Sequence, residues 1–232
     1  MGEFLRFGGR LREAIPWHKR TIEQARELGS KDEEAIMLRD LAFIHLELNE
    51  LQLARKLAEE ALVIQEHLGD PEGIAHALAV FPDIAMVEGN LDEALAMCDR
   101  WDSLVPDDDG EVRRELEVVR AEVYRRRGDE RHAAARLRAA AEKTLHAEES
   151  CFGIADILIV AADLVTPRAP TAAAQLVASA KRLCRETSFG LSFVLESERI
   201  TAGVATEEVD ELGFDDALRL VLDCLGSGDS RA

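Results

Sequence analysis

The sequence is poor in aromatic residues, proline and cysteine. Aromatic side chains make up 5% of the 232 residues, and there are only six prolines and four cysteines. The cysteines are widely separated and form no CxxC pair, so neither a disulfide framework nor a finger-type zinc site is indicated. Ala and Leu dominate the remainder, a composition that favours helices over sheets. We therefore expect an all-α protein from a reducing compartment, with no metal and no cofactor.

Positive charge is also scarce. Lys and Arg number 28 against 46 Asp and Glu, which gives a formal net charge of -18. Nucleic acids and anionic membranes are bound through neutralising Lys and Arg, so we expect no direct contact with either. The longest apolar stretch, residues 152–165, is too short for a membrane span and contains Asp156 and Asp163, and no secretory signal is present. A cytoplasmic protein is expected.

Alanine recurs with a period of about 40 residues. Turn-forming residues are followed about four positions later by Ala14, Ala54, Ala94, Ala133 and Ala174. Twelve positions before these alanines stand Gly2, Ala42, Pro82, Ala121 and Ala162. Small residues at fixed points on two successive helices let the backbones approach closely. Each period therefore predicts a hairpin of helix A, a short turn and helix B.

The second period shows where these helices begin and end. Its helix A is predicted over residues 30–48, where Ser30 and Glu33 form a candidate capping box. Its helix B is predicted over residues 51–69, and Gly29 marks the end of the preceding helix B.

Proline sets two further boundaries. After Gly69, the Asp70-Pro71 pair predicts an N-cap followed by proline in the first turn of the next helix. Pro82 falls inside the third helix A, where it removes a backbone hydrogen bond and clashes with the preceding turn. We expect a kink or break near residues 78–82, with a bend accommodated by packing as the alternative.

The repeat is lost after about residue 190. We assign residues 1–190 to the repeat array, 191–225 to C-terminal capping helices and 226–232 to a disordered tail. Counting twelve positions back from Ala14 places Gly2 at the small-residue site of a helix A, so residues 2–7 are expected to be the second half of that helix. The first repeat is thus expected to be truncated, and the chain to be a fragment of a longer array.

These landmarks resemble the tetratricopeptide repeat family over roughly residues 2–190. The similarity rests on the small residues Ala42, Ala121 and Ala162 and on the helix B alanines, whereas the aromatic residue usual three positions after the small site is matched only by Tyr124. The patterns "ELGD..GIA.AL" and "GN.DEA" are similar to the C-terminal helical region of large bacterial ATP-binding transcriptional regulators of the LuxR and maltose-regulator type. The resemblance implies a right-handed superhelix of antiparallel hairpins that senses or docks a peptide, protein or small effector.

The resemblance also implies a ligand groove on the helix A surfaces, at positions counted back from the helix B alanines. These groove positions include Arg39, Phe43, His76, Asp83, Glu115, Glu122, Arg125, Asp156 and Asp163. The groove is expected to be acidic toward its C-terminal half and apolar toward its N-terminal half. Its carboxylates are expected to receive a basic peptide or another domain of the same regulator, with a solvated acidic face that binds nothing as the alternative.

No enzyme motif is found in the sequence. The acidic run at residues 107–109 lacks the ligand pattern of a calcium loop, and each histidine is distant in sequence from any nucleophile. We therefore predict a non-catalytic interaction and regulatory module of a bacterial transcriptional regulator. A free-standing scaffold or adaptor is the alternative. An exposed end of the array would also favour a homodimer.

Overall fold

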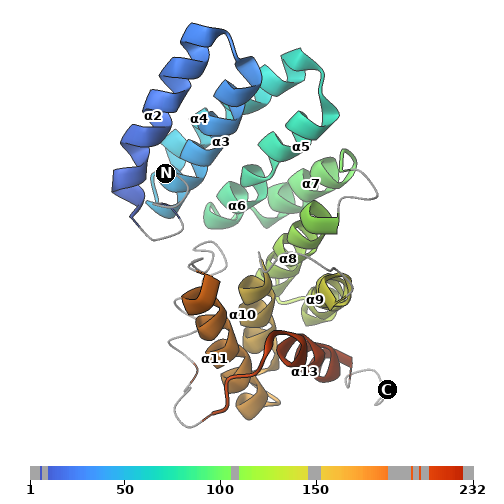
Figure 1. Ribbon diagram of the computed structural model, residues 1–232. Coiled ribbons are helices and arrows are strands. Elements are labelled where there is room, and N and C mark those ends of the chain that lie inside the picture. Colours follow the sequence, from blue (N-terminus) through green and yellow to red (C-terminus); the bar gives the residue numbers. More distant parts are fainter. Residues whose placement is uncertain are drawn as a thin grey trace. The chain divides into compact units, whose positions relative to one another are not determined.

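The computed structural model describes residues 6, 10–105, 110–145, 153–187, 200, 204 and 209–226. This part of the chain consists of helices joined by turns, with no strand, which confirms the all-α prediction (Figure 1). Contacts divide the chain into two compact units, Met1–Asp108 and Asp109–Ala232. None of the described helices is long and apolar enough to cross a membrane.

The helices of the first unit pack as hairpins with their neighbours in sequence. They are α2 (Leu11–Leu28), α3 (Lys31–Glu47), α4 (Leu51–Leu68), α5 (Pro71–Leu78), α6 (Val80–Val87) and α7 (Leu91–Asp102). Helix α3 packs against both α2 and α4, and α6 packs against α7. Helices α3 and α4 end within one residue of the ends predicted for the second period, because the turn residues that bound them act locally.

The second unit repeats this arrangement. It contains α8 (Gly110–Arg126), α9 (Glu130–Leu145), α10 (Ile154–Val165), α11 (Pro170–Thr187) and α13 (Phe214–Gly226). Helix α8 packs against α9 and α10 against α11, while α13 packs on α9, α10 and α11. The segment before α13 is tied to α11, since the Leu212 N–H donates to Ser179 Oγ at 2.9 Å. The predicted boundary at residue 190 lies outside the described residues and stays a prediction. The tail beyond Gly226 also lies outside them. Of the predicted truncated first helix only Arg6, which is helical, is described, so that prediction is likewise untested.

The recurring alanines lie in the interior of the helix packing. All five helix B alanines, Ala14, Ala54, Ala94, Ala133 and Ala174, are buried, as are the helix A residues Ala42, Ala121 and Ala162. The neighbouring Ala134 is only partly buried. The alignment of the fourth period on Ala133 is therefore confirmed, and the period marks the helix contacts as predicted.

Helix ends follow the backbone chemistry of the turn residues. Gly29 and Gly69 end α2 and α4 with φ of 71° each, a left-handed conformation that glycine adopts without the steric cost of a Cβ. Asp70 caps α5, and its carboxylate accepts from the backbone N–H groups of Glu72 and Gly73 at 3.2 Å each. The helix ends at Gly29 and Gly69 and the cap at Asp70 were all predicted from the sequence.

The capping box predicted at Ser30 is wrong. Ser30 does precede α3, but its hydroxyl makes no capping hydrogen bond. The polar contacts at this end of α3 instead involve Glu34, whose carboxylate is buried and accepts from Lys31 and from Arg26 of α2. The start of α3 is therefore marked by an ion pair with α2 and not by a side-chain cap.

The predicted break at Pro82 is confirmed. Helix α5 ends at Leu78 and α6 begins at Val80, so the third helix A consists of two short pieces. Pro82 has no N–H to donate to the Leu78 carbonyl, and the Ala79 N–H bonds to the His76 carbonyl at 3.4 Å in a tighter turn. Ala79 itself keeps right-handed helical dihedrals, with φ of -54° and ψ of -30°, so the interruption is one residue long.

Candidate functional site

In the first unit, two of the predicted groove residues lie beside one hollow. Arg39 of α3 and His76 of α5 line it together, although they are 37 positions apart and belong to successive repeats. The remaining lining residues are Ala35, Ile36, Gln65, Gly73 and Ala77. The hollow is small and open to solvent. The A helices of neighbouring repeats therefore do form a shared surface at this point.

One residue that lines the hollow, Gln65, was not predicted from the sequence. Gln65 comes from α4, is 2% exposed, and donates through Nε2 to Asp32 Oδ1 at 2.8 Å. Its Oε1 accepts no hydrogen bond from any described residue. A Cβ at Gly73 would overlap this amide oxygen, so the glycine makes room for the Gln65 side chain. The signal in the sequence was the glycine of the repeated "GIA" pattern, which marks a close approach.

The positive charge of Arg39 is compensated locally. Its Nε and Nη2 donate to Asp40 Oδ1 at 3.1 and 2.7 Å. Asp40 is buried, and its second oxygen accepts no hydrogen bond within the described part of the chain. The hollow is thus lined by the guanidinium of Arg39 and the imidazole of His76, with the Asp40 carboxylate paired to the guanidinium.

Phe43, the predicted apolar position of the groove, is covered by a cation. The Arg6 guanidinium carbon lies 4.7 Å from the centroid of the Phe43 ring, and Arg6 Nε donates to Glu47 Oε1 at 2.8 Å. Asp83, the acidic groove position of this unit, is 9% exposed on α6 and does not line the hollow. The first unit therefore presents Arg39 and His76 together, with Phe43 and Asp83 in separate environments.

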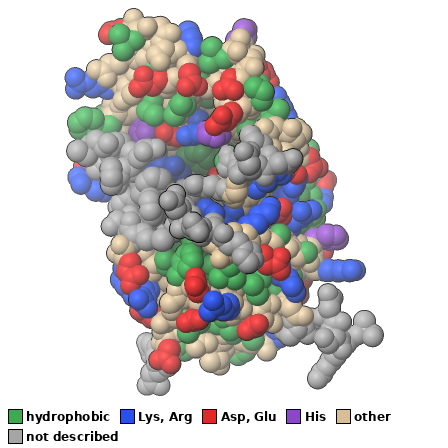
Figure 2. Space-filling model, turned by 45° about the vertical axis from the view of Figure 1, so that its right-hand side comes forward, with side chains coloured by type: hydrophobic (Ala, Val, Ile, Leu, Met, Phe, Trp, Pro, Cys, Tyr) green, Lys and Arg blue, Asp and Glu red, His purple; other side chains and the backbone are tan. Residues whose placement is uncertain are grey.

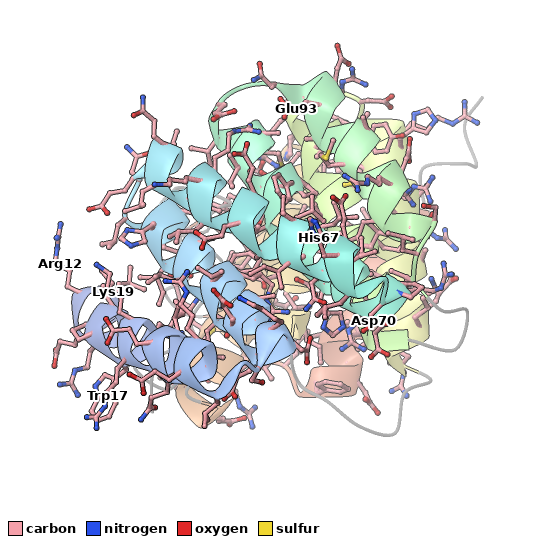
Figure 3. The ribbon with its side chains drawn as sticks, turned by 90° about the horizontal axis from the view of Figure 1, so that it is seen from above. Arg12, Trp17, Lys19, His67, Asp70 and Glu93 are labelled. Atoms are coloured by element: carbon pink, nitrogen blue, oxygen red, sulfur yellow. The ribbon has the colours of Figure 1, made fainter. Side chains whose placement is uncertain are left out.

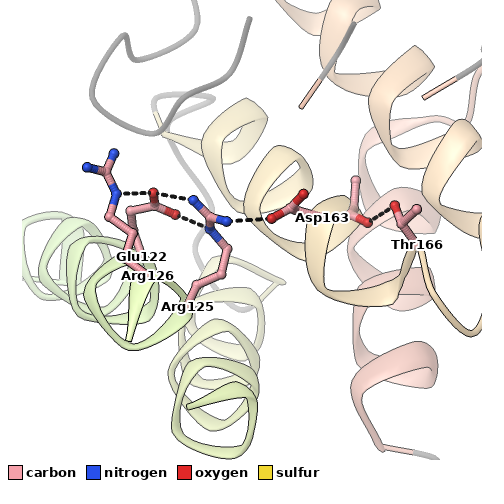
Figure 4. A network of polar contacts seen from close by, with 6 residues as sticks. Glu122, Arg125, Arg126, Asp163 and Thr166 are labelled. Atoms are coloured by element: carbon pink, nitrogen blue, oxygen red, sulfur yellow. Dashed lines mark hydrogen bonds and ion pairs between the residues drawn. The ribbon is translucent and has the colours of Figure 1, made fainter. Parts of the chain in front are cut away.

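In the second unit, three predicted groove residues form one ion-pair network (Figure 4). Glu122 of α8 is fully buried and accepts from Arg125 Nε and Nη2 at 2.7 and 2.8 Å. Its Oε1 also accepts from Arg126 Nε at 2.7 Å. Arg125 Nη1 donates to Asp163 Oδ2 of α10 at 2.6 Å. The remaining two positions, Glu115 and Asp156, are half-buried on α8 and α10.

This network balances its own charge. A buried carboxylate is strongly unfavourable unless it is paired and hydrogen-bonded, and the forked guanidinium of Arg125 provides such pairing to two carboxylates at once. Arg126 was not among the groove residues predicted, because sequence spacing does not show which way its side chain turns. The carboxylates of Glu122 and Asp163 are thus already engaged by arginines of the same protein.

Ion pairs also recur on the surface of the first unit. Arg26 Nη2 of α2 pairs with Glu60 of α4 at 2.7 Å, and Arg100 of α7 with Glu66 of α4 at 2.6 Å, so each pair links the B helices of adjacent repeats. Figure 2 shows acidic and basic side chains intermingled on the face in view. The large net negative charge is therefore not gathered into one acidic field on this face.

Two observations concern cysteine reactivity and metal binding. Burial raises the pKa of the Cys184 and Cys224 thiols, which disfavours the reactive thiolate. Within the described residues, no group of three or more His, Cys, Asp or Glu side chains could hold a metal ion.

The chain consists of helix hairpins with a period of about 40 residues, which pack through small residues and share a surface between successive A helices. These features define a tetratricopeptide-type helical repeat protein. The sequence model of the family described as the MalT-like TPR region matches residues 1–209, and the chain belongs to this family. No curated protein matches the chain. Regions of this type are generally interaction folds rather than catalytic ones, and they generally bind proteins.

Proposed function

We propose that this chain is the non-catalytic sensor or docking region of a bacterial transcriptional regulator, which binds a protein or peptide partner on its A helices in the cytoplasm. The observation that carries the proposal is the hollow lined by Arg39 and His76, because residues predicted from groove positions in two repeats come together there. Membership of the MalT-like family supports the regulatory role.

In the second unit, the proposed partner is a basic segment of a peptide or of another domain of the same regulator. The net charge of -18 supports a basic partner, and the Asp163 side chain remains 25% exposed. Glu122 is closed to such a partner because its side chain is fully buried. An incoming cation would therefore compete with Arg125 for Asp163.

Site-specific photo-crosslinking in cells tests the groove. A benzoylphenylalanine placed at Ile36, on the wall of the hollow, is expected to capture the partner, which mass spectrometry then identifies. The matched control carries the same group at Glu59, an exposed position on helix B α4. Capture of the same proteins from both positions, or from neither, would count against a binding groove on the A helices.

A charge-matched pair of variants tests the basic partner. Asp163→Asn and Glu59→Gln each remove one negative charge, the first inside the network and the second on an exposed helix surface. With a fluorescent oligolysine peptide as probe, Asp163→Asn should weaken binding several-fold while Glu59→Gln leaves it unchanged. Equal effects of the two substitutions would indicate only a solvated acidic surface.

A further inference from the structure

Helix α2 exposes large apolar side chains along one line. Trp17 is 48% exposed and Leu28 is 81% exposed, while Ala14, His18 and Ile22 on another face of the helix are buried. Trp17, Thr21, Gln24 and Leu28 follow one another at intervals of four, three and four residues, and this spacing places them on a single stripe of the helix. Figure 3 shows Trp17 projecting away from the body of the first unit.

The spacing of this stripe is that of a two-helix contact. Intervals of four and three residues are those of the seam along which two helices pack knobs into holes. The stripe is also symmetric: a twofold axis between positions 22 and 23 would place Trp17 against Leu28 of a second copy, and Thr21 against Gln24 of a second copy. An antiparallel pair of α2 helices would thus cover both exposed apolar side chains and match the two polar ones.

The charged residues beside the stripe favour the same antiparallel arrangement. Arg20 and Glu27 occupy equivalent flanking positions seven residues apart, and both are exposed. Neither makes an ion pair with a described residue. In an antiparallel pair, Arg20 of each copy would meet Glu27 of the other, which gives two symmetric ion pairs. A parallel pair would instead bring Arg20 opposite Ala25 of the other copy, so neither ion pair would form.

We infer that the α2 stripe is a self-association surface whose occupant is α2 of a second copy of this chain, packed antiparallel about a twofold axis. The contact is isologous, because the same patch serves both copies. A helix of 18 residues is about 27 Å long, and a single pair of such helices lies at the small end of specific interfaces. The dimer should therefore be weak and concentration-dependent. This inference does not depend on the groove.

Sedimentation velocity over a micromolar concentration series tests the inference on the full chain. The wild type should shift from monomer to dimer as concentration rises. Arg20→Glu and Glu27→Arg should each weaken dimerisation about tenfold or more, because each places like charges opposite one another. Mixing these two variants should restore a dimer, since the heterodimer regains both ion pairs.

A matched control and a second readout complete the test. Arg12→Glu makes the same charge change on α2 away from the stripe, as Figure 3 shows by the different directions of Arg12 and Trp17, and should leave dimerisation unchanged. Iodide quenching of Trp17 should fall on association, while Trp101, 1% exposed, contributes a constant background. A monomer at every concentration, an Arg12→Glu effect equal to that of Arg20→Glu, or a mixture of the two single variants that stays monomeric would overturn the inference.

Discussion

Arg125 joins Asp163 across the interface between α8 and α10, with Nη1 donating to Oδ2 at 2.6 Å. The same guanidinium holds the fully buried Glu122 through its two other nitrogens. One side chain therefore satisfies a buried carboxylate on its own helix and links that helix to the next repeat. Arg125, which the sequence spacing assigned to ligand binding, is therefore also part of the internal packing of the second unit.

Removing Arg125 should destabilise the second unit. Arg125→Met leaves Glu122 buried with Arg126 as its remaining ion-pair partner in the network, and breaking a buried pair in this way costs about 3 kcal/mol. Hydrogen exchange followed by mass spectrometry should show faster exchange in peptides from α8 and α10. Arg131→Met, on an exposed position of α9, should change exchange little, and an equal loss in both variants would contradict a special role for Arg125.

Acidification should weaken the contact between α2 and α3. Burial raises the pKa of Glu34, but hydrogen bonds from Lys31 and Arg26 outweigh burial and hold the pKa below its ordinary value. The folded state then favours the carboxylate, so the stabilisation is present above the unfolded pKa of about 4.3 and is lost as pH falls through the lower folded value.

Glu34→Gln measures this contribution. At neutral pH the variant should be about 2 kcal/mol less stable than the wild type, and the difference should shrink as pH falls below about 4. Urea unfolding in a Trp17→Phe background, followed through the buried Trp101, reports on the first unit. Glu33→Gln, at an exposed neighbouring position, is the control, and a Glu34→Gln difference that stayed constant with pH would refute the assignment.

Gly73→Ala should be unfavourable only while Gln65 is present. Alanine normally stabilises a helix by about 1 kcal/mol relative to glycine, but here the new methyl group would displace the Gln65 amide and break its bond to Asp32. We expect a net loss of about 1 kcal/mol.

In a Gln65→Ala background the same substitution should become neutral or stabilising. A double-mutant cycle from urea unfolding measures the coupling. Gly110→Ala, where a Cβ meets nothing within 4 Å, should be tolerated in either background. If Gly73→Ala behaved identically with and without Gln65, the steric explanation would fail.

The alignment of the fourth repeat can be tested with two adjacent alanines. Ala133→Leu inserts three carbons where the side chain is fully buried, and overpacking of this kind costs about 1 to 3 kcal/mol. Ala134→Leu enlarges a partly buried position and should cost less than about 0.5 kcal/mol. Thermal unfolding monitored by circular dichroism compares the two, and a reversed order would place the repeat one residue later.

The placement of the residues at the predicted groove positions could be read from the sequence only in part. Counting from the helix B alanines identified Arg39 and His76, which do line one hollow, because the period determines which side of helix A faces the next repeat. The same counting could not show that Arg6 covers Phe43 or that Arg125 pairs with Glu122 and Asp163. Those contacts depend on side-chain rotamers and on which opposite charge lies within reach.

The all-α class and the 40-residue period could be predicted from the amino-acid sequence. The helix ends at Gly29 and Gly69, the cap at Asp70 and the break before Pro82 could be predicted in the same way. These features depend on backbone conformation and on small residues at close helix contacts, both of which are local or periodic. Three contacts are visible only in the folded protein: Glu34 bonds to Arg26, Gln65 lines the hollow, and Arg125 bridges two repeats. Each of these depends on the distance and direction between side chains of different helices, which spacing along the chain does not specify.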